Sequence, residues 1–179
     1  MKPALLMLAV ALAAPAQTAM KPVATVEPQQ KTPIPRQTLL DLEKGFDEKL
    51  NAMGGADPFD LLGNTRGIYL AGYGVVFTTE LSLIRTPGYS PMRQSFSKDE
   101  IAKVRKRKLD RLPVLRLAMK DMITAVGSAL AAMPANEKIV LAVRLEYLPY
   151  EDTAGLPAQV VMSATRAAAM ASAIQVDEQ

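Results

Sequence analysis

The stretch SFSKDEIAKVRKRKLDRLPVLRLAMKDMITAVGSALAAM, residues 95–133, decides how the rest of the chain can fold. Ser97 and Glu100 have the spacing of a capping box, and Phe96 and Ile101 can form a hydrophobic staple, so a helix is predicted to begin here. Apolar residues then recur at helical spacing as far as Met133. The members of this stripe are Ile101, Val104, Leu112, Leu115, Met119, Met122, Val126 and Leu130.

Two residues interrupt this helical pattern. Lys108 falls on the apolar stripe at a position where an apolar residue is expected. Pro113 lies inside the pattern and removes a helical hydrogen bond, which predicts a kink or a break into two helices. The part after Pro113 has the better apolar face and is expected to pack on a sheet.

Strand patterns occur on both sides of the long helix. Before it, residues 68–70 and 75–83 are separated by the turn-forming residues 71–74, which predicts a hairpin. After it, residues 138–147 alternate apolar and polar side chains, and residues 158–164 are expected to form their hairpin partner. Phe77 and Val143 are predicted to face the core.

Three shorter elements complete the predicted fold. A first helix is expected to begin near Thr38, one capped helical turn at residues 57–63, and a last helix, capped by Thr165, to run to Ile174. The order favours an α+β fold: a two-layer sandwich with a four-stranded, mainly antiparallel sheet of two hairpins, a long kinked helix between them and flanking helices.

The N-terminal residues are typical of an export signal. Lys2 precedes an apolar run over residues 4–14, and residues 14–16 resemble a cleavage site, so residues 1–16 are predicted to be a signal peptide. An uncleaved anchor is the alternative. We expect a bacterial protein of the periplasm or extracellular space, with a Pro-rich disordered tether at 17–36, a single domain at 37–176 and no transmembrane segment in the mature chain.

Two residue types are missing from the chain, and their absence excludes several kinds of chemistry. With no cysteine and no histidine, the chain cannot provide thiol catalysis, a Cys/His zinc site, histidine-ligated haem or a Ser-His-Asp triad. We therefore expect no cofactor. The net charge of only +3 does not indicate nucleic-acid binding.

The clearest candidate binding segment is a cluster of cations within the long helix. A partner would be an envelope protein or an anionic envelope surface, and the alternative is an ordinary solvated helix face. The cations are Lys103, Arg105, Lys106, Arg107, Lys108 and Arg111.

Carboxylates supply the main candidates for catalysis or metal binding. Glu151 and Asp152 are weak metal candidates because two adjacent carboxylates do not form a coordination sphere. Glu80 and Glu146, on outward strand positions, are further candidates for a hydrolase. Convergence of these groups in one cleft would favour an enzyme, and dispersal would favour a binder. We expect an exported, non-enzymatic envelope protein that acts as a binding or structural module; a carboxylate-dependent or metal-assisted hydrolase and a small-ligand carrier are the alternatives.

If the export signal is cleaved as predicted, the mature protein begins at Gln17. Intact-mass analysis of the exported protein should give the mass of residues 17–179. Retention of Met1 in that material would show that the N-terminal segment is an anchor.

Overall fold

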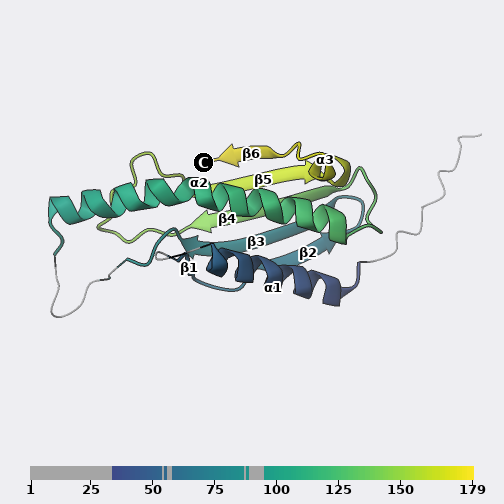
Figure 1. Cartoon of the computed structure of the whole chain (residues 1–179), viewed down its shortest axis with the longest axis horizontal. Helices are drawn as coiled ribbons and strands as arrows, with labels where there is room; N and C mark the ends of the chain where they lie inside the picture. The colour runs from purple at the N-terminus through teal and green to yellow at the C-terminus, as the bar shows by residue number, and fades with distance from the viewer. Residues whose placement is uncertain (1–33, 54, 56–57, 87, 89–94) are drawn as a thin grey trace, which may run out of the picture. The chain divides into compact units, whose positions relative to one another are not determined.

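Helix α2, Lys98–Ala129, is the longest element of the fold (Figure 1). The Ser97 hydroxyl accepts a hydrogen bond from the Glu100 backbone N–H at 3.3 Å, and the Glu100 carboxylate accepts one from the Ser97 N–H at 2.9 Å. This confirms the predicted capping box. Of the kink or break predicted at Pro113, the break is wrong, because α2 continues through it as one helix, with the proline on an exposed position.

A computed structural model describes residues 34–53, 55, 58–86, 88 and 95–179. The predicted signal peptide and most of the predicted tether lie outside these residues. The described part forms one mixed sheet with three helices. Besides α2, its elements are α1 Arg36–Ala52, β1 Asp60–Leu61, β2 Arg66–Leu70, β3 Gly74–Ser82, β4 Lys138–Leu145, β5 Gln159–Thr165, α3 Arg166–Met170 and β6 Gln175–Glu178.

The sheet has six strands and includes one parallel pair. Its order is β1-β3-β4-β5-β6. Strand β2 pairs with residues 74–78 of β3, and β1 pairs with residues 81 and 82. Both predicted hairpins are present, as β2–β3 and β4–β5. Strands β3 and β4 run parallel, so the predicted four-stranded, mainly antiparallel sheet is corrected to a six-stranded mixed sheet. The cause is α2, which returns the chain along the sheet between the two hairpins, as a crossover between parallel strands requires.

Three local predictions are also corrected. The expected helical turn at residues 57–63 contains strand β1, which pairs with the end of β3. The last helix ends at Met170 instead of Ile174, and the chain then forms β6, which extends beyond the predicted domain boundary at 176. Helix α1 begins at Arg36 instead of Thr38, with Pro35 as its N-cap.

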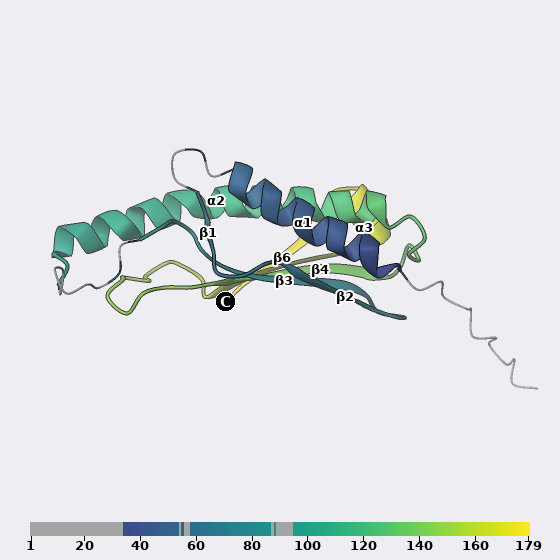
Figure 2. The ribbon, with the colours of Figure 1, turned by 90° about the horizontal axis from the view of Figure 1, so that it is seen from below.

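The helices lie on one face of the sheet, and the core lies between the two layers (Figure 2). Phe77 and Val143 are fully buried in this core, while Glu80 and Arg144 point to the opposite face of the sheet. We call this face, made of the outward side chains of β2 to β6, the open face. The prediction that Phe77 and Val143 face the core is therefore confirmed. None of the helices in the described part of the chain is long and apolar enough to span a membrane.

Helix α1 closes the outer edge of β2 with polar side chains. The Glu43 carboxylate accepts a hydrogen bond from the Gly67 N–H at 2.8 Å, and Arg36 donates one to the Gly67 carbonyl at 2.8 Å. The Asp47 carboxylate accepts hydrogen bonds from the N–H and hydroxyl of Thr65. A Cβ atom on Gly67 would lie 2.5 Å from the Phe77 ring, so only glycine fits there. The outward backbone groups of Gly67 are thus satisfied without another strand.

Helix α2 is longer than the sheet it covers. Its 32 residues span about 48 Å at ~1.5 Å per residue, whereas the nine residues of β3 span only about 30 Å at ~3.3 Å per residue. About the first third of α2 therefore extends past the ends of the strands and lies over the loop of residues 146–157 (Figures 1 and 2). This overhang needs contacts that the sheet does not provide.

Two substitutions test the assignment of α2. Leu115→Ala should lower the free energy of unfolding by about 2–5 kcal/mol because Leu115 is fully buried. Ser97→Ala should cost about 1 kcal/mol through loss of the cap. Urea denaturation checks both values, and equal, negligible losses would contradict the placement of the helix.

Candidate functional site

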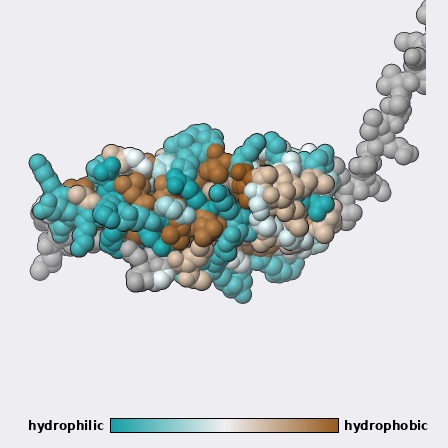
Figure 3. Space-filling model, turned by 45° about the horizontal axis from the view of Figure 1, so that its top comes forward, coloured by the Kyte–Doolittle hydropathy of each residue, from teal (hydrophilic) through white to brown (hydrophobic). Residues whose placement is uncertain are grey.

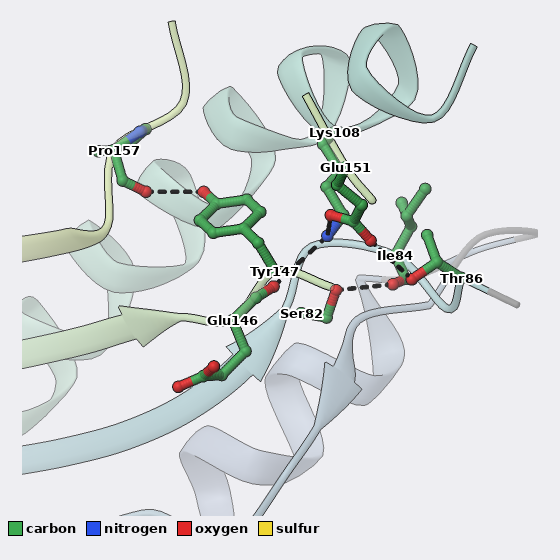
Figure 4. Close-up of polar contacts among 8 residues, drawn as sticks. All are labelled: Ser82, Ile84, Thr86, Lys108, Glu146, Tyr147, Glu151 and Pro157. Carbon is green, nitrogen blue, oxygen red and sulfur yellow. Dashed lines mark hydrogen bonds and ion pairs between the residues drawn. The ribbon is translucent and has the colours of Figure 1, made fainter. Parts of the chain in front are cut away.

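Lys108 is buried, contrary to the prediction that it belongs to a charged surface. Its side chain is 1% exposed and forms an ion pair with Glu151, which is also 1% exposed (Figure 4). Lys108 takes the place of an apolar residue on the α2 stripe, so it faces the loop of residues 146–157 beneath the overhang. A buried ammonium requires a partner, and Glu151 provides it.

The surroundings of this ion pair satisfy both charged groups. The Lys108 ammonium also lies 3.4 Å from the Glu146 carbonyl oxygen and 4.7 Å from the centre of the Tyr147 ring. The Thr86 hydroxyl donates a hydrogen bond to the Glu151 carboxylate at 3.0 Å. The groups come from α2, from the loop that follows β4 and from the residues that follow β3, so the pair joins three parts of the chain.

Burial shifts the pKa of two side chains at the buried ion pair, Lys108 and Tyr147. It lowers the pKa of Lys108, although the neighbouring Glu151 carboxylate opposes the shift. Burial, together with the charge of Glu151, raises the pKa of Tyr147 to about 12. The Tyr147 hydroxyl therefore stays protonated at neutral pH and donates a hydrogen bond to the Pro157 carbonyl at 2.6 Å.

Other cations of the predicted cluster also make contacts within the domain. Arg105 donates a hydrogen bond to the Ala154 carbonyl at 2.7 Å and lies 3.6 Å from Asp152. Arg111 stacks over Phe59 at 4.3 Å, and Lys106 pairs with Asp110 at 2.8 Å. Lys103 is exposed, and Arg107 is half-buried. Arg105 and Lys108 thus hold the overhang against the loop, whereas Lys106 pairs within α2 and stays exposed.

An aromatic stack adds to the same attachment. The rings of Phe96, just before α2, and Tyr150, in the loop below, are stacked with their centroids 3.7 Å apart. Together with Lys108–Glu151 and Arg105–Asp152, this stack fastens the loop to the first half of α2 at three places. We call residues 146–157 the clamp loop.

The candidate carboxylates do not converge in one cleft. Glu80 and Glu146 both contact Arg144, at 3.2 and 2.6 Å, on the open face. Glu151 is buried with Lys108, and Asp152 is exposed beside Arg105. No group of three or more acidic residues able to hold a metal ion is found among the described residues. Each candidate carboxylate has a cation as its neighbour.

The open face of the sheet is a second candidate site, which the sequence reasoning missed. The strand register places aliphatic side chains from four adjacent strands next to one another on this face. Ile68 and Leu70 are 57% and 44% exposed, which is high for large apolar residues. The aliphatic side chains are Ile68, Leu70, Val76, Val140, Ala142 and Val161.

Polar groups line one end of the open face. A hollow of about 410 Å³ lies there, with Arg66, Glu80, Arg144 and Gln159 among its lining residues. Alternation along each strand indicates which residues point outward, but only the register shows which of them are neighbours.

Comparison with known proteins identified no relative: no family model, no curated protein and no solved structure matches the chain.

The buried ion pair can be tested by removing one or both charges. Glu151→Leu should lower the free energy of unfolding by about 3–5 kcal/mol because it leaves the Lys108 ammonium buried without its counter-ion. The double variant Lys108→Met with Glu151→Leu should recover most of this loss, since no charge remains buried.

Lys106→Met is the matched control, because Lys106 is an exposed, paired lysine two positions away on the same helix. It should change stability little. Chemical denaturation of all four proteins checks these values. A double variant as unstable as Glu151→Leu would contradict the interpretation that the loss comes from an unpaired charge.

Proposed function

We propose that the chain is an exported, non-enzymatic protein that acts as a binding or structural module of the cell envelope, and that it binds a protein partner through the open face. The observation that carries this proposal is the layer arrangement: three helices cover one face of the sheet, while the other presents a set of aliphatic side chains, of which Ile68 and Leu70 are exposed and the others half-buried. Exposed, contiguous apolar surface of this kind marks sites of interaction between proteins.

The placement of the carboxylates supports a binding role over hydrolysis. A general acid or base must reach the reacting group, and a metal-assisted mechanism needs several ligands around one point. Here Glu151 is buried against Lys108, and Glu80 and Glu146 are both paired with Arg144, with Glu80 but not Glu146 lining the hollow of the open face. These contacts stabilise the fold and leave no two candidate carboxylates facing a common cleft.

The position of the cations favours the open face over the first half of α2 as the binding surface. Lys108 is unable to contact an outside partner, and Arg105, Lys106 and Arg111 have contacts within the domain. An anionic surface would therefore meet fewer available charges than the sequence suggests. The open face offers adjacent aliphatic side chains to a partner, and apolar burial is the main driving force of association.

Site-specific photo-crosslinking in the native cells tests this proposal. A photoreactive amino acid at Ile68 or Val140, on the open face, should form a discrete covalent adduct with the partner. The same group at Lys44, on an exposed position of α1, is the matched control and should form none. Adducts from Lys44 alone, or from none of these positions, would contradict binding through the open face.

A further inference from the structure

We propose that the partner of the open face is a second copy of this chain, and that the two sheets pack face to face around a two-fold axis that runs along β4. This inference rests on the proposed function, since it uses the same face. Its evidence is the order of side chains in one row across the sheet.

That row carries opposite charges at its two ends. The register aligns one outward residue from each of five strands, and the three inner residues are small or aliphatic. Arg66 stands at the β2 end and Asp177 at the β6 end, and both are exposed. Neither has an ion-pair partner within the described ranges. In order, the row is Arg66, Thr78, Ala142, Val161 and Asp177.

A two-fold axis along the middle strand makes this row complementary to itself. The axis exchanges the two edges of the sheet, so Arg66 of one copy faces Asp177 of the other, and the same contact forms twice. Ala142 then lies on the axis, and Thr78 of each copy faces Val161 of the other. Two-fold interfaces bury the same patch of both subunits, and this row meets that requirement.

The next row adds apolar contact near the axis. Val140 lies beside Ala142 on β4, and Val76 neighbours it on β3. In the two-fold arrangement Val140 meets Val140 of the second copy, so aliphatic side chains fill the centre while charged groups lie at the rim. This distribution matches the general pattern of an apolar interface centre with a polar rim.

The axis also brings the two charged outward residues of β4, Lys138 and Arg144, close to the same residues of the second copy. Each Arg144 is already paired with Glu80 and Glu146 at 3.2 and 2.6 Å. Each Arg144 with its two carboxylates has a net charge of −1, so the two groups would meet as weakly anionic clusters and not as two unpaired guanidinium cations.

The area of the face is sufficient for a modest dimer. Five strands about 4.8 Å apart and four rows of side chains about 6.8 Å apart give a footprint of roughly 600 Å² per copy. Specific interfaces commonly bury about 800 Å² per partner, so a dimer in rapid exchange with monomer is expected. Aligned packing of two sheets, with the helices outside, accommodates this geometry.

Reversal of the charges at the two ends of the row tests the arrangement. Arg66→Glu alone and Asp177→Arg alone should each raise the dissociation constant about tenfold or more, because each places like charges opposite one another twice. The double variant restores opposite charges and should return the constant to within about threefold of the unaltered protein. Sedimentation equilibrium of the full chain measures all of these constants.

Two further variants and a folding check complete the experiment. Ala142→Arg should abolish the dimer, because it places a charge on the axis, and Lys44→Glu on α1 should leave the constant unchanged. Circular dichroism should show that every variant is folded. A monomeric unaltered chain, single reversals without effect, or a double reversal that fails to restore association would each overturn the inference. If the chain is monomeric and the Ile68 crosslink joins it to a different protein, the proposed function stands and the inference about a second copy fails.

Discussion

The length of α2 relative to the sheet is the constraint on which the rest of the structure depends. A helix of about 48 Å can connect β3 to a parallel β4 and cover both, but about a third of it remains beyond the strands. The sheet cannot bury that part. The clamp loop does so instead, and it uses charge: Glu151 pairs with the Lys108 ammonium, and Tyr147 covers it. The same helix therefore explains the mixed sheet, the buried ion pair and the bare opposite face.

The contacts of the clamp loop also explain why the cationic segment of α2 does not by itself indicate a binding surface. Six cations in nine residues suggest a binding surface when they are counted along the chain. In the fold, a helix distributes them around its axis, so that Lys108 points inward and Arg105 reaches the Ala154 carbonyl of the clamp loop. A buried ion pair contributes little net stability compared with an apolar pair, but it penalises arrangements in which the helix and loop are out of register.

The sequence predicted where helices and strands occur better than it predicted which strands lie next to one another. The cap at Ser97, the two hairpins and the burial of Phe77 follow from local patterns, and all three are present. The parallel pairing of β3 with β4 could not be read from alternation, which defines faces but not directions. Strand β6 has a polar sequence and exposed residues, so it lacks the apolar pattern that identifies strands. The burial of Lys108 was indicated by its place on the apolar stripe, whereas Glu151 became identifiable only in the fold.

The central claim is that self-association uses the open face of the sheet and leaves the helix side free. Figure 3 shows that the side with α2 and β6 also bears hydrophobic patches, and Leu117 on α2 is 53% exposed, so the two surfaces must be compared directly. Methyl NMR spectra of the full chain, recorded over a dilution series, make this comparison. The account predicts concentration-dependent shifts for the Ile68 and Val140 methyl groups and none for Leu117. Shifts confined to Leu117, or no shifts at any of the three, would contradict it.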